Sequence, residues 1–174
     1  MNLLHNNTLG IDIGSTTVKI AVLDSEQHIL FTDYERHYAN IQETLALLLS
    51  KAKEKLGEMT VSPSITGSGG LTLSGHLNVP FTQEVVAVAT ALQDYAPQTD
   101  VAIELGGEDA KIIYFTGGID QRMNGICAGG TGSFIDQMAS LLQTDAAGLN
   151  EYAKNYQMIY PIAVSYTHLT LPTT

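Results

Sequence analysis

Residues 9–24, LGIDIGSTTVKIAVLD, place a short polar turn between two apolar runs that have the composition of β-strands. Gly14 permits a backbone turn that a side chain would block, and the hydroxyl residues 15–17 leave N–H and O–H groups free to face an anion. Asp12 precedes the turn and Lys19 follows it, so the stretch suits a nucleotide phosphate with Mg²⁺. An ordinary β-hairpin with a Gly-Ser turn is the alternative, because short glycine-rich turns are weak motifs.

A second stretch repeats this plan without a gap. Residues 103–115 are IELGGEDAKIIYF, in which Glu104, Gly106 and Lys111 have the spacing of the acid, glycine and lysine of the first stretch. A chance match of three such residue types at identical spacing would be rare. Two such hairpins that face each other could clamp a triphosphate, each bringing one carboxylate toward Mg²⁺, a cation that prefers oxygen ligands.

Together, DIGSTTVK and ELGGEDAK resemble the two phosphate loops of the sugar kinase, actin and heat-shock chaperone ATPase superfamily. Residues 123–139, MNGICAGGTGSFIDQMA, are similar to the signature of the ATP-dependent activators of 2-hydroxyacyl-CoA dehydratases, relatives of the benzoyl-CoA reductase ATPase subunits. The resemblance implies an α/β, actin-like ATPase (ribonuclease H-like) fold with one complete lobe and a truncated second lobe. Residues 1–97 would form the first lobe and 98–163 the start of the second, followed by a non-native tail at 164–174.

The resemblance also implies roles at matching motif positions. Asp12 and Glu104 would organise Mg²⁺ and its waters, and Glu104 would also orient the attacking water, although the family more often has Asp there. ATP would be held by two loops, through Gly14, Ser15, Thr16, Thr17 and Lys19 in the first and Gly106, Gly107, Glu108, Asp109 and Lys111 in the second. Catalysis of this kind depends mainly on positioning and charge stabilisation.

Cys127, the single cysteine, stands in a glycine-rich turn ahead of a helix expected at 133–142. Such a turn presents free N–H groups and a positive dipole end, which favours a thiolate and hence metal ligation. A small buried cysteine is the alternative. The resemblance implies that Cys127 ligates a 4Fe–4S cluster bridging a homodimer, with two cysteines from each subunit, and the second of these has no counterpart here. ATP hydrolysis would then drive one-electron transfer to a 2-hydroxyacyl-CoA dehydratase.

The composition excludes several other classes of partner. A net charge of −10 argues against nucleic acid and against an anionic membrane surface. No apolar run approaches the ~20 residues that span a bilayer, and the N-terminus lacks the regions of a signal peptide. A single cysteine agrees with a reducing compartment, so we expect a cytoplasmic protein.

Three alternatives to the activator function remain open. A sugar or acid kinase of the same superfamily would share the phosphate loops but needs a base over a substrate hydroxyl, and would leave Cys127 unexplained. A non-enzymatic actin-like scaffold would assemble with ATP into polymers. The chain, which lacks half a lobe and a ligand of the family, could also be inactive.

The remaining patterns predict local structure. Asn40 with Glu43 forms a capping box, and the helix at 83–95 is apolar on most faces and should be buried between layers. His37 should be a solvated residue at a strand end. The glycine run 67–70 either approaches the nucleotide or a partner, or simply joins a strand to a helix. We expect strands at 28–36, 61–66 and 119–126 and further helices at 41–56 and 145–156.

Overall fold

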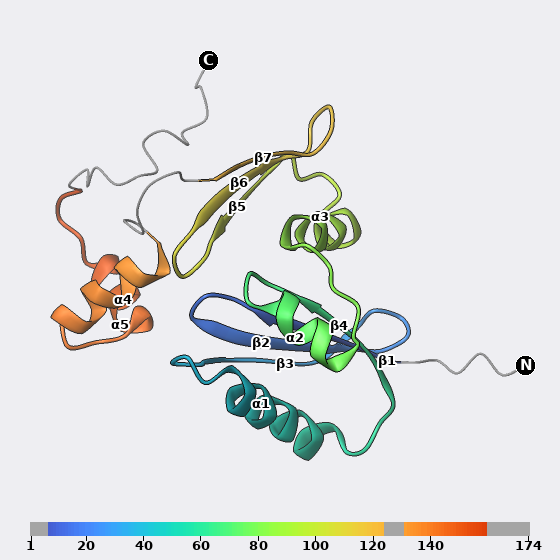
Figure 1. Ribbon diagram of the computed structural model, residues 1–174. Coiled ribbons are helices and arrows are strands. Elements are labelled where there is room, and N and C mark those ends of the chain that lie inside the picture. Colours follow the sequence, from blue (N-terminus) through green and yellow to red (C-terminus); the bar gives the residue numbers. More distant parts are fainter. Residues whose placement is uncertain (1–6, 124–130, 160–174) are drawn as a thin grey trace, which may run out of the picture. The chain divides into compact units, whose positions relative to one another are not determined.

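The computed structural model describes residues 7–123 and 131–159 and divides into two compact units, 1–97 and 98–174 (Figure 1). Each unit combines a β-sheet with helices, as alternating strand and helix patterns in the sequence predict. Among the described residues, no helix is both long enough and apolar enough to cross a membrane.

The first unit is built on a four-stranded sheet with the order β3-β2-β1-β4. Its strands are β1 (Asn7–Ile13), β2 (Thr17–Leu23), β3 (Ile29–Arg36) and β4 (Val61–Thr66). The first three are antiparallel neighbours, whereas β4 runs parallel to β1. The parallel pairing requires a crossover, which α1 (Ile41–Leu56) supplies on one face of the sheet (Figure 1).

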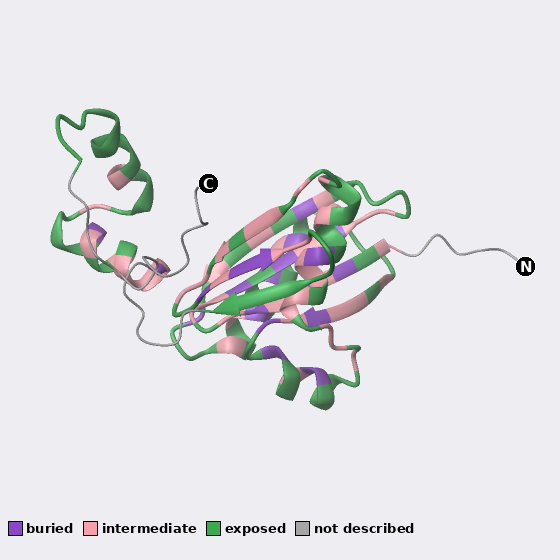
Figure 2. Cartoon of the chain, turned by 90° about the horizontal axis from the view of Figure 1, so that it is seen from above, coloured by how far each residue is buried: buried purple, intermediate pink, exposed green. Residues whose placement is uncertain are grey.

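Alternation along β1 and β2 creates the core of this unit. Ile11, Ile13 and Val18 are buried on the sheet face that α1 covers, and Leu48 from α1 is fully buried against them. Figure 2 shows this buried material along the central strands. Burying one such aliphatic side chain contributes about 1.5–3 kcal/mol, so the packing of α1 on the sheet fixes the end of β1 where Asp12 lies.

The start of α1 differs from the capping box that the sequence predicts. Asn40 is the N-cap residue, but its side chain caps no backbone N–H and instead donates to the Glu43 carboxylate. Tyr38 and Ala39, just before it, both have left-handed backbone conformations (φ 44° and 67°). This turn gives Asn40 φ −110° and ψ 62°, outside the extended region in which a capping side chain reaches the helix amides.

Ion pairs also join α1 to β3. The Lys51 ammonium lies 2.6 Å from the Glu35 carboxylate and 3.1 Å from that of Asp33. Hydrogen bonds to Glu35 and then Asp33 raise the pKa of Lys51 above its usual value.

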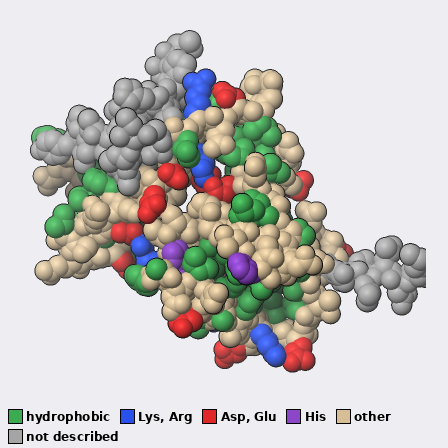
Figure 3. All heavy atoms as spheres, in the orientation of Figure 1, with side chains coloured by type: hydrophobic (Ala, Val, Ile, Leu, Met, Phe, Trp, Pro, Cys, Tyr) green, Lys and Arg blue, Asp and Glu red, His purple; other side chains and the backbone are tan. Residues whose placement is uncertain are grey.

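Figure 3 shows one face of the molecule, with acidic side chains spread among a few basic ones.

Two helices follow β4, namely α2 (Gly70–Leu77) and α3 (Glu84–Tyr95). The prediction that α3 is buried between layers is wrong for the described structure. Only Ala89 is buried, whereas Val86 and Tyr95 are 50% and 59% exposed. The reason is that a cavity separates the inner side of α3 from the sheet, so the helix contributes lining residues rather than a packed apolar face.

The second unit contains an antiparallel sheet with the order β5-β6-β7. Its strands are β5 (Val101–Leu105), β6 (Ala110–Tyr114) and β7 (Asp120–Met123), and its helices are α4 (Gly132–Leu141) and α5 (Ala146–Lys154). The last residues of the strand predicted at 119–126 lie outside the described residues. Asp145 caps α5 by accepting the Gly148 N–H at 2.8 Å.

Candidate functional site

The hairpin formed by β1 and β2 carries the first predicted phosphate loop. Asp12 and Lys19 face each other in the strand register, and the Lys19 ammonium lies 2.7 Å from the Asp12 carboxylate. The Gly14 N–H donates to the Thr17 carbonyl at 2.9 Å, which closes the turn. An acid and a lysine are thereby fixed side by side at the mouth of a glycine turn.

The hairpin formed by β5 and β6 repeats this local geometry. Glu104 faces Lys111 in the register, and the Gly106 N–H donates to the Asp109 carbonyl at 2.8 Å. The Lys111 ammonium lies 3.4 Å from the Glu104 carboxylate, a longer separation than in the first hairpin. The side chain of Lys111 is also only 12% exposed, so this pair is more buried than its counterpart.

Two buried acceptor atoms, one in the second hairpin and one beside the first, make no hydrogen bond among the described residues. The Oε2 atom of Glu104 is buried and has no hydrogen-bond partner among the residues that the structure describes. The same holds for Oγ1 of Thr66, which lies beside Asp12 in the parallel register of β1 and β4. Burying an acceptor without a partner is costly, so a bound cation or water would stabilise such a group. Within the described ranges, no group of three or more metal-ligating side chains gathers at one place.

The turn residues of the first hairpin also carry unbonded polar groups in the described structure. In the described part of the chain, the hydroxyl groups of Ser15, Thr16 and Thr17 and the N–H of Ser15 make no hydrogen bond. In the second hairpin, the side chains of Glu108 and Asp109 belong to exposed residues. Ser15, Lys19, Glu108 and Asp109 are therefore exposed, whereas Lys111 is largely buried and the strands below the turns are paired.

The glycine run 67–70 joins β4 to α2 and also lies against the first hairpin. Gly67 has φ +96°, and a Cβ there would come within 2.2 Å of the Ile13 carbonyl oxygen and 2.5 Å of an Asp12 carboxylate oxygen. The Gly69 N–H donates to the same Ile13 carbonyl at 2.9 Å. The run is thus a strand-to-helix loop whose backbone lies against Ile13 and Asp12. An approach of this run to the nucleotide or to a partner stays a prediction.

Glu84, at the first position of α3, also contacts this run. Its carboxylate accepts the Ser68 N–H at 3.0 Å, so the helix start is tied to the glycine loop. A carboxylate near a helix N-terminus is favoured by the helix dipole.

His37 contradicts the prediction of a solvated strand-end residue. It is 8% exposed, and both ring nitrogens are used. Nδ1 accepts the Ala39 N–H at 3.0 Å, so the proton is assigned to Nε2, which donates to the Gly14 carbonyl at 3.2 Å. The contact spans from the end of β3 to the phosphate turn, and no local sequence pattern signals it.

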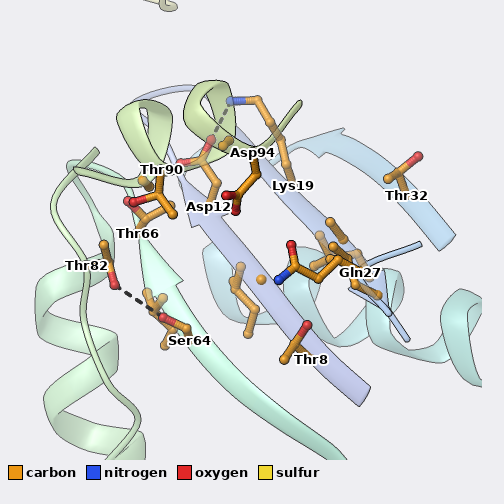
Figure 4. A pocket seen from close by; sticks show the side chains of 18 of the residues that line it. Thr8, Asp12, Lys19, Gln27, Thr32, Ser64, Thr66, Thr82, Thr90 and Asp94 are labelled. Carbon is orange, nitrogen blue, oxygen red and sulfur yellow. Dashed lines mark hydrogen bonds and ion pairs between the residues drawn. The ribbon is translucent and has the colours of Figure 1, made fainter. Parts of the chain in front are cut away.

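A cavity of about 1030 Å³ lies within the first unit, between α3 and the sheet face opposite α1. Asp12 and Lys19 line it together with Asp94 and Thr90 from α3 (Figure 4). The strand residues on this face alternate with the core residues, which is why threonines and serines supply much of its polar lining. The sequence analysis did not foresee this cavity because it depends on the spacing between α3 and the sheet.

The segment that begins α4 is bonded directly to the second hairpin. The Gly132 N–H donates to the Gly106 carbonyl at 2.9 Å, and the N–H and Oγ of Ser133 donate to the Gly107 carbonyl at 3.0 and 2.6 Å. These bonds connect residues that are 26 positions apart. The predicted cluster ligand Cys127 lies outside the described residues.

These features define a class of protein before any comparison is made: an α/β chain with two glycine-turn hairpins, each pairing an acid with a lysine. Similarity to solved structures confirms the actin-like ATPase fold. The chain has a TM-score of 0.73 and 27% identity with component A of the (R)-2-hydroxyglutaryl-CoA dehydratase of Acidaminococcus fermentans, covering 91% of this chain and 62% of that one. The chain has a TM-score of 0.72 and 26% identity with the 2-hydroxyisocaproyl-CoA dehydratase activator of Clostridium difficile, which was solved with bound ADPNP. This similarity covers 91% of this chain and 60% of that one.

The chain belongs to the BadF/BadG/BcrA/BcrD ATPase family, whose sequence model matches residues 9–159. It is 32% identical over 156 residues to the activator of lactoyl-CoA dehydratase of Anaerotignum propionicum, covering 84% of this chain and 59% of the relative. It is 30% identical over 149 residues to the (R)-2-hydroxyglutaryl-CoA dehydratase activating ATPase of Acidaminococcus fermentans, covering 83% and 56%. The family resemblance noted in the sequence is confirmed, and the chain spans less than two thirds of the length of these relatives.

Proposed function

We propose that this chain is the nucleotide-binding part of an ATP-dependent activator of a 2-hydroxyacyl-CoA dehydratase. The observation that carries the proposal is the repeated hairpin, in which an acid faces a lysine beside a glycine turn. Membership of an ATPase family supports nucleotide binding, and one similar protein was solved with ADPNP. The similar proteins named above are activators of dehydratases, which supports this class of partner.

In this proposal, Mg·ATP lies between the two loops. Asp12 and Glu104 organise Mg²⁺ and its waters, and Glu104 orients the attacking water. Carboxylate oxygens are the ligands that Mg²⁺ prefers, and the unpartnered Oε2 of Glu104 suits such a contact. The bound ion would neutralise charge that develops on the phosphates during hydrolysis.

The phosphate groups would contact the turn residues and the two lysines. Among the described residues, the unbonded hydroxyl groups of residues 15–17 and the Ser15 N–H suit phosphate oxygens, and Lys19 neutralises their charge. In the second loop, Gly106, Gly107, Glu108, Asp109 and Lys111 would form the opposite wall. Lys19 must exchange part of its contact with Asp12 for phosphate, which its 51% side-chain exposure permits.

The redox part of the proposal concerns the complete protein. Cys127 would be a ligand of a 4Fe–4S cluster that bridges a homodimer and passes one electron to the dehydratase in the cytoplasm. A cluster of this type takes four thiolates, and this sequence supplies one cysteine, so two copies of the chain do not complete the set.

Nucleotide binding is tested by titrating the purified chain with ATP in the presence of Mg²⁺ in a calorimeter. We expect saturable binding that weakens about tenfold or more in Asp12→Asn and in Glu104→Gln, because each loses a charged oxygen at the metal. Glu58→Gln is the matched control, since Glu58 pairs with Lys53 on the exposed end of α1. If both acids serve one ion, the double variant loses less than the sum of the single losses. Unchanged affinity in both single variants would contradict the proposal.

Cluster binding is tested separately by anaerobic reconstitution with iron and sulfide. Cys127→Ser should lose any thiolate-to-iron absorption band that the parent chain acquires. A longer version of this protein that contains a further cysteine should show the absorption band at full intensity. If neither the present chain nor the longer version acquires the band, the kinase or scaffold alternatives would be favoured.

A further inference from the structure

His37 makes two separate contacts with the phosphate turn of the first hairpin. Its backbone N–H donates to the Thr16 carbonyl at 3.1 Å, and its Nε2–H donates to the Gly14 carbonyl at 3.2 Å. The side chain is 8% exposed, which excludes most competing water. A histidine thus holds two carbonyl groups of a loop whose residues 15–17 are proposed to bind phosphate.

The backbone around His37 is arranged to present the ring in this position. Tyr38 and Ala39 adopt φ angles of 44° and 67°, a region that L residues with side chains rarely occupy. This turn brings the Ala39 N–H to Nδ1 at 3.0 Å, which leaves the ring proton on Nε2. The ring therefore faces Gly14 as a donor, with its tautomer fixed by the neighbouring peptide.

The contact has a geometric consequence for the loop. A trans peptide is planar, so its C=O and N–H point in opposite directions. Holding the Gly14 carbonyl against His37 therefore fixes the direction of the Ser15 N–H, which has no partner in the described part of the chain. Preorganised N–H groups bind anions better than mobile ones, because less ordering is required on binding.

We propose that His37 is a positioning residue for nucleotide binding, which orients the Ser15 amide by holding the Gly14 carbonyl. The inference rests on the proposed function of the first hairpin as a phosphate loop. His37 does not touch the nucleotide in this arrangement. It acts through the backbone of the turn, so its removal should affect phosphate affinity without removing any ligand-contacting group.

Two substitutions separate the two ring contacts. His37→Gln places an amide nitrogen at about the reach of Nε2 and keeps a donor for Gly14, whereas His37→Asn keeps an acceptor near Nδ1 but loses the reach to Gly14. We expect His37→Asn to weaken Mg·ATP binding about tenfold, as one lost hydrogen bond permits, and His37→Gln to stay within about twofold of the parent. His76→Asn is the matched control, because His76 lies at the exposed end of α2.

A second readout needs no nucleotide. Amide ¹⁵N order parameters for Gly14 and Ser15 should fall in His37→Asn and remain at the parent value in His37→Gln, while the thermal midpoints of both variants are recorded as a measure of folding. Equal behaviour of the Gln and Asn variants in both affinity and order parameters would overturn the role of His37. Failure of the parent chain to bind Mg·ATP would instead overturn the proposed function, and the order parameters would still decide whether His37 orients the turn.

Discussion

At the scale of single residues, the position of Gly67 has no room for a side chain. Its positive φ already favours glycine, and an added Cβ would lie 2.5 Å from an Asp12 oxygen. Gly57 has a similar φ of +79°, but nothing lies within 4 Å of the corresponding Cβ position. Comparing substitutions at the two positions therefore distinguishes the cost of backbone strain from the cost of a clash with Asp12.

This difference predicts unequal effects of two alanine substitutions. Gly57→Ala should cost about 1–3 kcal/mol of unfolding free energy from backbone strain alone, because φ 79° with ψ −167° is a conformation essentially restricted to glycine. Gly67→Ala should cost more and should also weaken Mg·ATP binding, because Asp12 must move. Urea unfolding and nucleotide titration measure the two effects. Equal losses of stability, with nucleotide affinity intact in both variants, would show that the loop yields without disturbing Asp12.

Asp24 closes the turn between β2 and β3. Its hydrogen bonds in this turn lead us to expect that the stability of the fold depends on pH. Backbone N–H groups of His28 and Glu26 donate to its carboxylate at 2.9 and 2.8 Å, and the bond from His28 is the largest cause that lowers the pKa of Asp24 below 3.8. A carboxyl group with a lowered folded pKa stabilises the fold above its unfolded pKa and loses that contribution as pH falls through the folded value. Asp24→Asn should therefore flatten the loss of stability below about pH 4. Urea midpoints measured at neutral and acidic pH test this, with Glu26→Gln as the exposed control.

At the scale of elements, α4 and the second hairpin behave as one piece. The bonds from Gly132 and Ser133 to the Gly106 and Gly107 carbonyls tie the helix start to the loop proposed to face the nucleotide. A displacement of that loop would therefore be passed to α4 through short hydrogen bonds rather than through side-chain packing alone. The coupling is a property of the described backbone and does not depend on what Cys127 binds.

Removing one of these bonds should loosen α4 locally. Ser133→Ala deletes the hydroxyl bond to Gly107 and should cost about 1 kcal/mol. We expect faster amide hydrogen exchange at the start of α4, with unchanged exchange in β1 and β4. Ser140→Ala, at an exposed position of the same helix, is the control. Exchange that rises equally in both variants would mean that the Gly107 contact does not hold the helix start.

At the scale of the whole molecule, the sequence predicted what depends on neighbouring residues and missed what depends on distant ones. The bounds of α1 and β4 and the hairpin with Asp12 before its turn and Lys19 after it follow from periodicity and spacing within a single segment. The burial of His37 and the exposure of α3 could not be predicted, because they depend on a contact between the end of β3 and a turn, and on a cavity beneath a helix. Family resemblance identified the fold, since two copies of one motif are a pattern that composition alone does not contain.

The proposed binding of one nucleotide by both loops predicts that Mg·ATP affects the two compact units together. A ligand that contacts only the folded state stabilises it by about 2.7 kcal/mol at a free concentration of a hundred times its Kd. If Mg·ATP contacts both loops, hydrogen exchange should slow in β1–β2 and in β5–β6 together. A tenfold weaker affinity in Asp12→Asn should reduce the stabilisation at that concentration to about 1.4 kcal/mol in both hairpins, including the one to which Asp12 does not belong. Protection confined to the hairpin of β1 and β2 would mean that the second loop binds no phosphate. Because Asp12 and Glu104 lie in different compact units, only a shared ligand or a change in the contact between units could transmit the effect of the substitution, and repeating the measurement without nucleotide distinguishes these two causes.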